Sequence, residues 1–128
     1  MSQLHDALRE IDDPVDQLVT YITMQVEYFS SNHLPPGPAL QYLLPQDAHE
    51  KIIEHVSSLD RTLDQILRSG ITQELFEIQD TSEVRPLVNA CISRERVTVD
   101  GPDTLPATIA FVLRALGVPD DRIATATA

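Results

Sequence analysis

The sequence predicts an all-α protein, an antiparallel helix bundle of five to six helices. Apolar residues recur at spacings of three and four along most of the chain, which is the period of a helix with one buried face. Clusters of Pro, Gly, Asp and Ser separate these segments, at places where helices begin and end. The one stretch that alternates like a strand, residues 97–99, is too short to found a sheet.

Length and composition indicate a single globular domain. The chain has 128 residues, 42% of them hydrophobic and 23% charged, which is enough to bury a core without disulfides or metals. Its one cysteine, Cys91, cannot form an internal disulfide, its N-terminus is polar and acidic, and no apolar run approaches the roughly 20 residues of a membrane helix. We therefore expect a cytoplasmic protein with no membrane partner.

The charge balance argues against nucleic-acid binding by this chain alone. Nine Lys and Arg residues stand against twenty Asp and Glu residues, for a net charge of -11, and the basic residues form no run. A surface this acidic repels phosphate backbones.

Two helices are predicted before residue 33. Residues 3–11 carry an apolar face with helical spacing and form a short helix. Asp13 as N-cap and Pro14 in the first helical position start a second helix, which fades at residues 30–32. Apolar residues cover so much of this second helix that we expect it to be buried on more than one side. These residues are Leu18, Val19, Tyr21, Ile22, Met24, Val26, Tyr28 and Phe29.

A proline-rich connection leads to the longest helix. Residues 33–45 contain Pro-Pro-Gly-Pro, which cannot continue a helix, and allow at most one or two turns at residues 39–44. An amphipathic pattern then runs for about six turns and ends at Gly70, where we expect the left-handed conformation of a helix C-terminus. The apolar turn over residues 71–76 should fold under the bundle.

The last part of the chain predicts two more helices and a tail. The first covers residues 80–92, with Asp80 or Thr81 as its cap. The second opens at residues 103–104 and stops at Gly117. The residues after it show no usable pattern and are expected to form a tail.

The sequence offers no candidate catalytic or metal site. A zinc-protease helix needs two histidines one turn apart, but Ile53 holds the second position and His55 lies on a different face from His49. Cys91 stands among apolar residues without a histidine base nearby, so it should pack like a small hydrophobe. Gly-rich phosphate loops, Gly-x-Ser-x-Gly elbows and Cys-x-x-Cys pairs are absent from the sequence. We expect neither an enzyme nor a bound cofactor.

One stripe on the second predicted helix combines apolar bodies with polar tips. Tyr21, Met24, Gln25 and Tyr28 lie beside its main apolar line, and His55 on the long helix could add a hydrogen-bonding group. Ligand pockets pair apolar walls with a few placed polar groups. Aromatic residues at helical spacing also pack in cores, so the stripe fits either a ligand cavity or a solid core.

Three stretches follow one another in a characteristic order. The first, residues 4–32, contains a short predicted helix, then Asp-Asp-Pro, then a long predicted helix. The second, residues 59–80, contains the end of the next long helix, followed by Gly-Ile, a Phe and an Asp. The third, residues 108–118, contains an apolar helix that ends in Leu-Gly. Over about residues 3–118, this order resembles the C-terminal ligand-binding and dimerisation domain of TetR-type (tetracycline-repressor-like) transcriptional regulators. One departure is Glu74, where that family often has a glycine.

The resemblance implies a single regulatory domain that forms a homodimer and senses a small, mostly apolar effector, which releases a repressor from DNA. Such regulators bind DNA through an N-terminal helix-turn-helix head. This chain starts at the connecting helix, so DNA binding would need a head that it lacks; it is either part of a longer regulator or a headless relative. Within residues 1–128, the resemblance assigns residues 1–12 to the connecting helix, 14–80 to ligand sensing, 81–117 to dimerisation and 118–128 to a tail.

The resemblance also implies residue roles. The implied ligand-binding residues are Tyr21, Met24, Gln25, Tyr28, Tyr42, His55 and Leu59. The implied dimer-interface residues are Leu87, Cys91, Ile109, Val112 and Leu113. The alternative is a helical protein–protein interaction module or adaptor without a ligand cavity.

Overall fold

The computed structural model of the chain confirms the predicted all-α architecture. It describes residues 2–32, 46–97 and 104–127, and the side chains of residues 4–27, 58–93 and 104–127. The turns expected at residues 39–44 lie outside this part of the chain. Regular structure within the described ranges consists of six helices, α1 (Ser2–Arg9), α2 (Pro14–Asn32), α4 (Gln46–Thr72), α5 (Thr81–Val97), α6 (Leu105–Ala115) and α7 (Asp120–Ala126).

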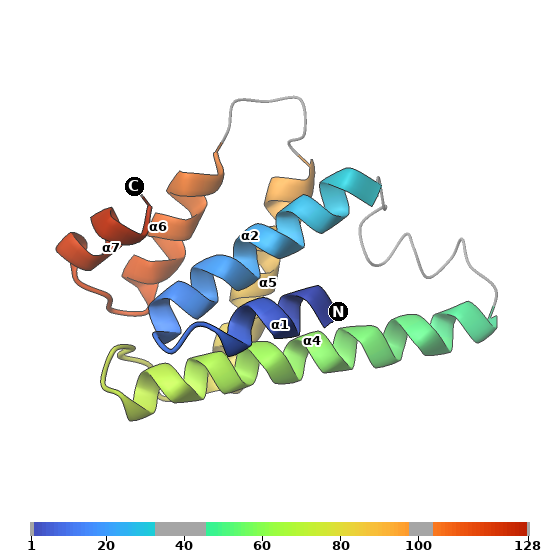
Figure 1. Ribbon diagram of the computed structural model, residues 1–128, viewed down its shortest axis with the longest axis horizontal. Coiled ribbons are helices and arrows are strands. Elements are labelled where there is room, and N and C mark those ends of the chain that lie inside the picture. Colours follow the sequence, from blue (N-terminus) through green and yellow to red (C-terminus); the bar gives the residue numbers. More distant parts are fainter. Residues whose placement is uncertain (1, 33–45, 98–103, 128) are drawn as a thin grey trace.

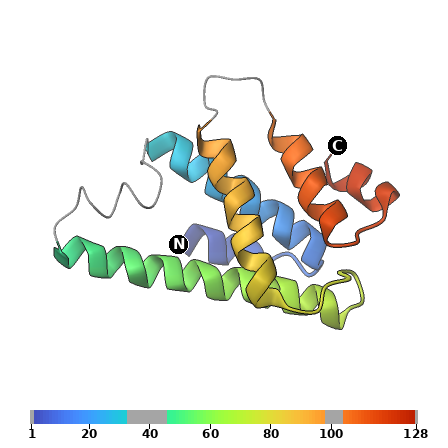
Figure 2. The same ribbon diagram turned by 180° about the vertical axis from the view of Figure 1, so that it is seen from behind.

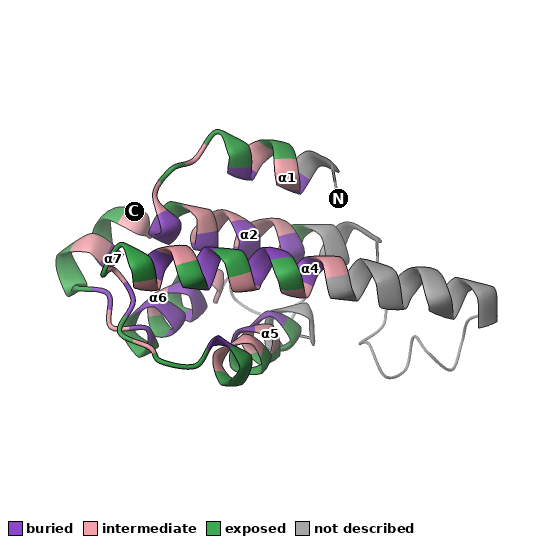
Figure 3. Ribbon diagram, turned by 90° about the horizontal axis from the view of Figure 1, so that it is seen from below, coloured by how far each residue is buried: buried purple, intermediate pink, exposed green. Residues whose placement is uncertain are grey.

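The helices are arranged in three layers, with α2 and α4 in the middle one (Figures 1 and 3). α1 lies on one side of this layer, and α5 and α6 lie next to each other on the other side. α7 packs against α6 and α2 at one end of the bundle. α2 therefore has neighbours on most of its sides, since it contacts α1, α4, α5, α6 and α7.

α2 is buried on more than one side, as its wide apolar stripe predicts. Val15, Leu18, Tyr21 and Ile22 are each at most 1% exposed. The hydrophobic core around them draws on every described helix, with contributions from Leu4, Leu63, Val88, Leu113 and Ile123. One core therefore joins the described parts of the chain.

The predicted start signals of α2 and α5 are confirmed. Asp13 Oδ1 accepts a hydrogen bond from the Val15 N–H at 2.8 Å, and Pro14 is the first residue of α2. Asp80 Oδ1 accepts one from the Ser82 N–H at 2.9 Å at the start of α5. A side-chain oxygen in this position pairs an N–H group that has no partner within its own helix.

The prediction that Gly70 ends the long helix is wrong. α4 continues to Thr72, and the residue in the left-handed conformation is Glu74, with a φ of 61°. The Leu75 N–H donates to the Gly70 carbonyl at 2.8 Å and the Glu74 N–H donates to the Ile71 carbonyl at 3.0 Å, which is a Schellman motif. Glu74 therefore occupies the position where such motifs favour glycine, and where the resembled family often has one.

Gly70 instead makes room for an aromatic ring. A Cβ atom added at Gly70 would lie 2.0 Å from Cδ2 of Phe76, so no side chain fits there unless the ring moves. Phe76 is 4% exposed, and its N–H donates to the Gly70 carbonyl at 3.1 Å. The apolar turn after α4 thus folds under the bundle, as the sequence predicts.

α6 ends as predicted, whereas the expected tail is a helix. Gly117 has a φ of 85°, and the Val118 N–H donates to the Leu113 carbonyl at 3.0 Å. Beyond this turn α7 buries Ile123, which is 2% exposed. The tail prediction is wrong because one buried apolar residue in a short helix gives no detectable period. α5 also extends further than predicted, to Val97.

Replacing Glu74 with glycine should raise the free energy of unfolding by about 1 kcal/mol, because an L-residue in the left-handed region is strained. Urea denaturation followed by circular dichroism measures the change. The control Gln73→Gly alters the preceding residue, which has a negative φ, and should lower the free energy of unfolding by about 0.5–1 kcal/mol. Destabilisation by Glu74→Gly would contradict a strained Glu74.

Candidate functional site

The described part of the predicted ligand site lies where α2 meets α4. Tyr21 is 1% exposed, and its hydroxyl donates to the Leu59 carbonyl at 3.5 Å. Burial, together with the negative charge of Asp60, raises the pKa of Tyr21 far above its ordinary value of 10.0, so the hydroxyl stays neutral. Gln25 and Leu59 are buried as well, and Met24 packs against the core. The structure thus brings these four predicted residues into or against the core.

The other three predicted ligand residues lie outside the described side chains. Tyr28 belongs to α2 and His55 to α4, and Tyr42 stands between these helices in the sequence. Ligand binding by these three residues stays a prediction.

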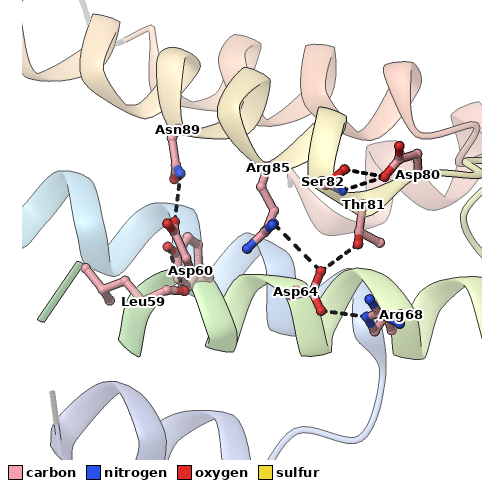
Figure 4. Close-up of polar contacts among 10 residues, drawn as sticks. Leu59, Asp60, Asp64, Arg68, Asp80, Thr81, Ser82, Arg85 and Asn89 are labelled. Atoms are coloured by element: carbon pink, nitrogen blue, oxygen red, sulfur yellow. Dashed lines mark hydrogen bonds and ion pairs between the residues drawn. The ribbon is translucent and has the colours of Figure 1, made fainter. Parts of the chain in front are cut away.

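A polar cluster centred on Asp64 joins α4 to α5 (Figure 4). Asp64 Oδ1 accepts a hydrogen bond from the Thr81 hydroxyl at 2.6 Å, and its Oδ2 accepts one from Arg68 Nε at 2.6 Å. Arg85 Nε lies 3.7 Å from Asp64 Oδ1, a distance for an ion pair but not for a hydrogen bond. The hydrogen bond from Thr81, aided by both arginines and opposed by partial burial, lowers the pKa of Asp64 below its ordinary value of 3.8.

Helical spacing accounts for this Asp64 cluster. Thr81, Arg85 and Asn89 are four residues apart on α5, and Asp60 and Asp64 are four apart on α4, so each set shares one helix face. Asn89 Nδ2 donates to Asp60 Oδ1 at 3.2 Å, one turn along from the Asp64 carboxylate (Figure 4). The cluster fixes the position of α5 along α4. The cluster was not predicted from the sequence: each set of residues repeats with a spacing of four, but this spacing does not show which two helix faces meet.

α5 and α6 lie on the side of the molecule away from α1 (Figure 2), and both helices expose apolar side chains, which we call together the outer α5–α6 face. Leu87 on α5 is 66% exposed and Phe111 on α6 is 64% exposed, and they are the large hydrophobic residues that the described part of the chain leaves exposed. Smaller apolar residues of the same two helices are exposed as well, and we count them with the outer α5–α6 face: Pro86, Ala90, Pro106, Ala107 and Ala115.

The structure divides the predicted dimer-interface residues into two groups. Leu87 is exposed, and Cys91 is a half-buried free thiol. The other three predicted interface residues pack in the core of the chain itself and are at most 5% exposed: Ile109, Val112 and Leu113. Phe111, which the sequence analysis did not single out, is the large apolar residue that α6 exposes.

Among the described residues, no group of three or more His, Cys, Asp or Glu side chains is placed to hold a metal ion. The described helices include none that is long and apolar enough to cross a membrane. The side chains of His49 and His55 lie outside the described set.

A scan of protein-family models, a search of curated proteins and a search of solved structures each gave no match to this chain. The resemblance to the TetR-type domain therefore rests on the order and spacing of the elements. The function has to be argued from the surfaces and contacts of the chain itself.

Replacing Asp64 with asparagine should lower the free energy of unfolding at pH 7 by about 1–2 kcal/mol, because the Thr81 and Arg68 donors lose a charged acceptor. The folded-state pKa of Asp64 lies below its ordinary value of 3.8, so its carboxylate stabilises the fold fully above about pH 5 and loses this effect as the pH falls. Urea denaturation from pH 7 downward should therefore show the two proteins converging in stability as the pH falls.

The control for this prediction is Asp6→Asn, because Asp6 forms an exposed ion pair with Arg9 at 4.0 Å. Exposed pairs contribute little, so this variant should lose less than about 0.5 kcal/mol. Equal losses in the two variants at pH 7 would contradict a stabilising role for the Asp64 cluster. A difference between wild type and Asp64→Asn that stays constant as the pH falls would contradict the assignment to the carboxylate form.

Proposed function

We propose that this chain is the effector-sensing and dimerisation domain of a TetR-type transcriptional regulator, and that two copies associate through the outer α5–α6 face. The exposure of Leu87 and Phe111 carries the proposal. Leu and Phe are among the residues most often buried in proteins, and here they lie exposed on two helices in contact with each other.

Packing against a second copy would bury both side chains. Removing one Leu or Phe side chain from water contributes roughly 1.5–3 kcal/mol, and a two-fold axis buries each residue once in each chain. Ala90, Ala107 and Ala115 are exposed on the same two helices, where small side chains let a neighbouring helix approach closely. Two helices from each chain would then form a four-helix interface.

The charge distribution also favours this face for self-association. Each chain carries a net charge of -11, so two copies repel each other over most of their surface. The sequence of α6 contains no Asp or Glu, and its one charged residue is Arg114. Two copies that meet through α6 therefore bring no additional carboxylates of this helix close together, so α6 adds little to the electrostatic repulsion between the chains.

The regulatory part of the proposal is supported by the order of the helices. α1 takes the place of the connecting helix of TetR-type regulators, α2 and α4 that of the ligand-sensing helices, and α5 and α6 that of the dimerisation helices. An effector that binds one arrangement of the bundle more tightly than another shifts the dimer between the two. In such a regulator a helix-turn-helix head contacts DNA, and the protein works in the cytoplasm, where Cys91 stays reduced.

Sedimentation velocity tests the dimer. The wild-type chain should sediment as a dimer at concentrations on the order of tens of micromolar. The double variant Leu87→Glu/Phe111→Glu should sediment as a monomer with unchanged circular dichroism, because the new carboxylates would face one another across the two-fold axis.

The matched control is Gln73→Glu, which adds a carboxylate to an exposed residue after the end of α4 and should leave the dimer intact. A wild-type chain that is monomeric at these concentrations would overturn the proposal and favour a helical interaction module. A double variant that dimerises as tightly as wild type would show that the two copies meet elsewhere.

A further inference from the structure

A cleft of about 360 Å³ is lined by residues of α1, α2 and α4. Figure 3 shows α1 on the side of the middle layer away from α5 and α6. This volume falls within the range of roughly 300–1,000 Å³ that is typical of small-molecule sites. The polar residues that line it come from all three helices: His5, Arg9, Gln17, Thr62, Gln65 and Ser69.

The chemistry of this α1–α2–α4 cleft differs from that of the rest of the chain. Two buried apolar residues contribute to its wall, Leu8 at 9% exposure and Ile66 at 4%. No carboxylate lines it, although the chain has twenty Asp and Glu residues, and its ionisable groups are one imidazole and one guanidinium. We propose that the cleft binds a small organic carboxylate, with the apolar part of the ligand on Leu8 and Ile66 and its carboxylate at Arg9.

Arg9 has donors available for such a ligand. Its side chain is 80% exposed. Among the described residues it pairs with Asp6, which is also exposed, at the distance limit of 4.0 Å. An exposed pair of this length contributes little, so a ligand carboxylate can replace it. The planar guanidinium can donate two parallel hydrogen bonds to a carboxylate, which Lys cannot do.

His5 and Thr62 fix one wall of the cleft. The Thr62 hydroxyl donates to the Ser58 carbonyl at 3.0 Å, and its oxygen lies 3.2 Å from His5 Nε2. Because the hydroxyl proton of Thr62 is already used, its oxygen accepts the hydrogen bond, and His5 Nε2–H is the donor. This hydrogen bond ties α1 to α4 before any ligand binds.

Gln17 connects α2 to the turn that follows α1. Its Nε2 donates to the Ile11 carbonyl at 2.7 Å, in the turn between α1 and α2. The same Nε2 lies 3.5 Å from the Leu8 carbonyl of α1, so polar contacts connect α1 and the turn after it to both α2 and α4. A site whose walls are fixed in advance loses less conformational entropy when it binds a ligand.

The bound ligand would contact Arg9 and Leu8 on α1 and Ile66 on α4, and it would therefore hold α1 in its position on the bundle. In the proposed regulator α1 connects to the DNA-binding head, so the ligand would favour one placement of that head. This regulatory consequence rests on the proposed function, whereas the binding itself does not.

Titration of the full chain with sodium benzoate, followed by two-dimensional amide NMR, tests the site. Benzoate should shift the signals of Thr62, Ser69 and Gln17 and saturate below concentrations on the order of 10 mM. Benzamide, which has the same ring without the charge, should bind at least about fivefold more weakly, because Arg9 loses a charged acceptor.

The variant Arg9→Gln should weaken benzoate binding by about fivefold or more. The matched control is Arg68→Gln, since Arg68 is also an exposed arginine paired with an aspartate of its own helix but does not line the cleft. The control should bind benzoate like wild type.

The absence of shifts at the three cleft residues, equal affinity for benzoate and benzamide, or equal weakening by both arginine variants would each overturn the site. The same titration on the Leu87→Glu/Phe111→Glu variant should give the wild-type affinity, because no residue of α5 or α6 lines the cleft. Failure of this proposal is thus separable from failure of the proposed dimer.

Discussion

α2 runs through the bundle with α1, α4, α5, α6 and α7 around it, and the positions of these helices depend on the side chains that α2 places between them (Figure 3). Burial of each such side chain contributes roughly 1.5–3 kcal/mol, so a change in α2 alters the contacts of all three layers. Tyr21 is the largest of these fully buried side chains, and its hydroxyl needs a partner inside the protein, which the Leu59 carbonyl provides.

The beginning of α2 is fixed by charge as well as by packing. Asp13 accepts a hydrogen bond from the Val15 N–H and another from Arg122 at 2.7 Å, and Asp16 accepts a second one from Arg122 at 3.0 Å. Burial acts to raise the pKa of Asp13, but hydrogen bonds from Arg122 and the backbone outweigh it and lower the pKa below 3.8. Both carboxylates also lie at the positive end of the α2 dipole. These contacts join α7 to the start of α2 and help to hold it against the bundle.

Helix signals made by neighbouring residues predicted the fold well, and signals that depend on distant contacts did not. Asp13 and Asp80 mark helix starts and Gly117 marks a helix end, and the structure confirms each. Gly70 has the sequence context of a helix end but serves to admit Phe76, a contact that no local pattern reveals. The candidate surfaces were harder to predict, because α6 is apolar on most sides and its sequence does not show which residues face the core. The α1–α2–α4 cleft combines three helices that are separated in sequence, so no motif marks it.

The fold leaves two unlike surfaces, a cleft lined by α1, α2 and α4 and the apolar outer α5–α6 face. α1 lies on the opposite side of the middle layer from α5 and α6 (Figures 2 and 3). We place the second copy of the chain on the outer α5–α6 face. An isotope-filtered NOE measurement on a mixture of labelled and unlabelled chains tests this placement most directly, because it detects only contacts between copies. We predict NOEs between chains from the methyl groups of Leu87 and the ring of Phe111. Their absence, or NOEs confined to α1 and α4, would contradict the proposed interface.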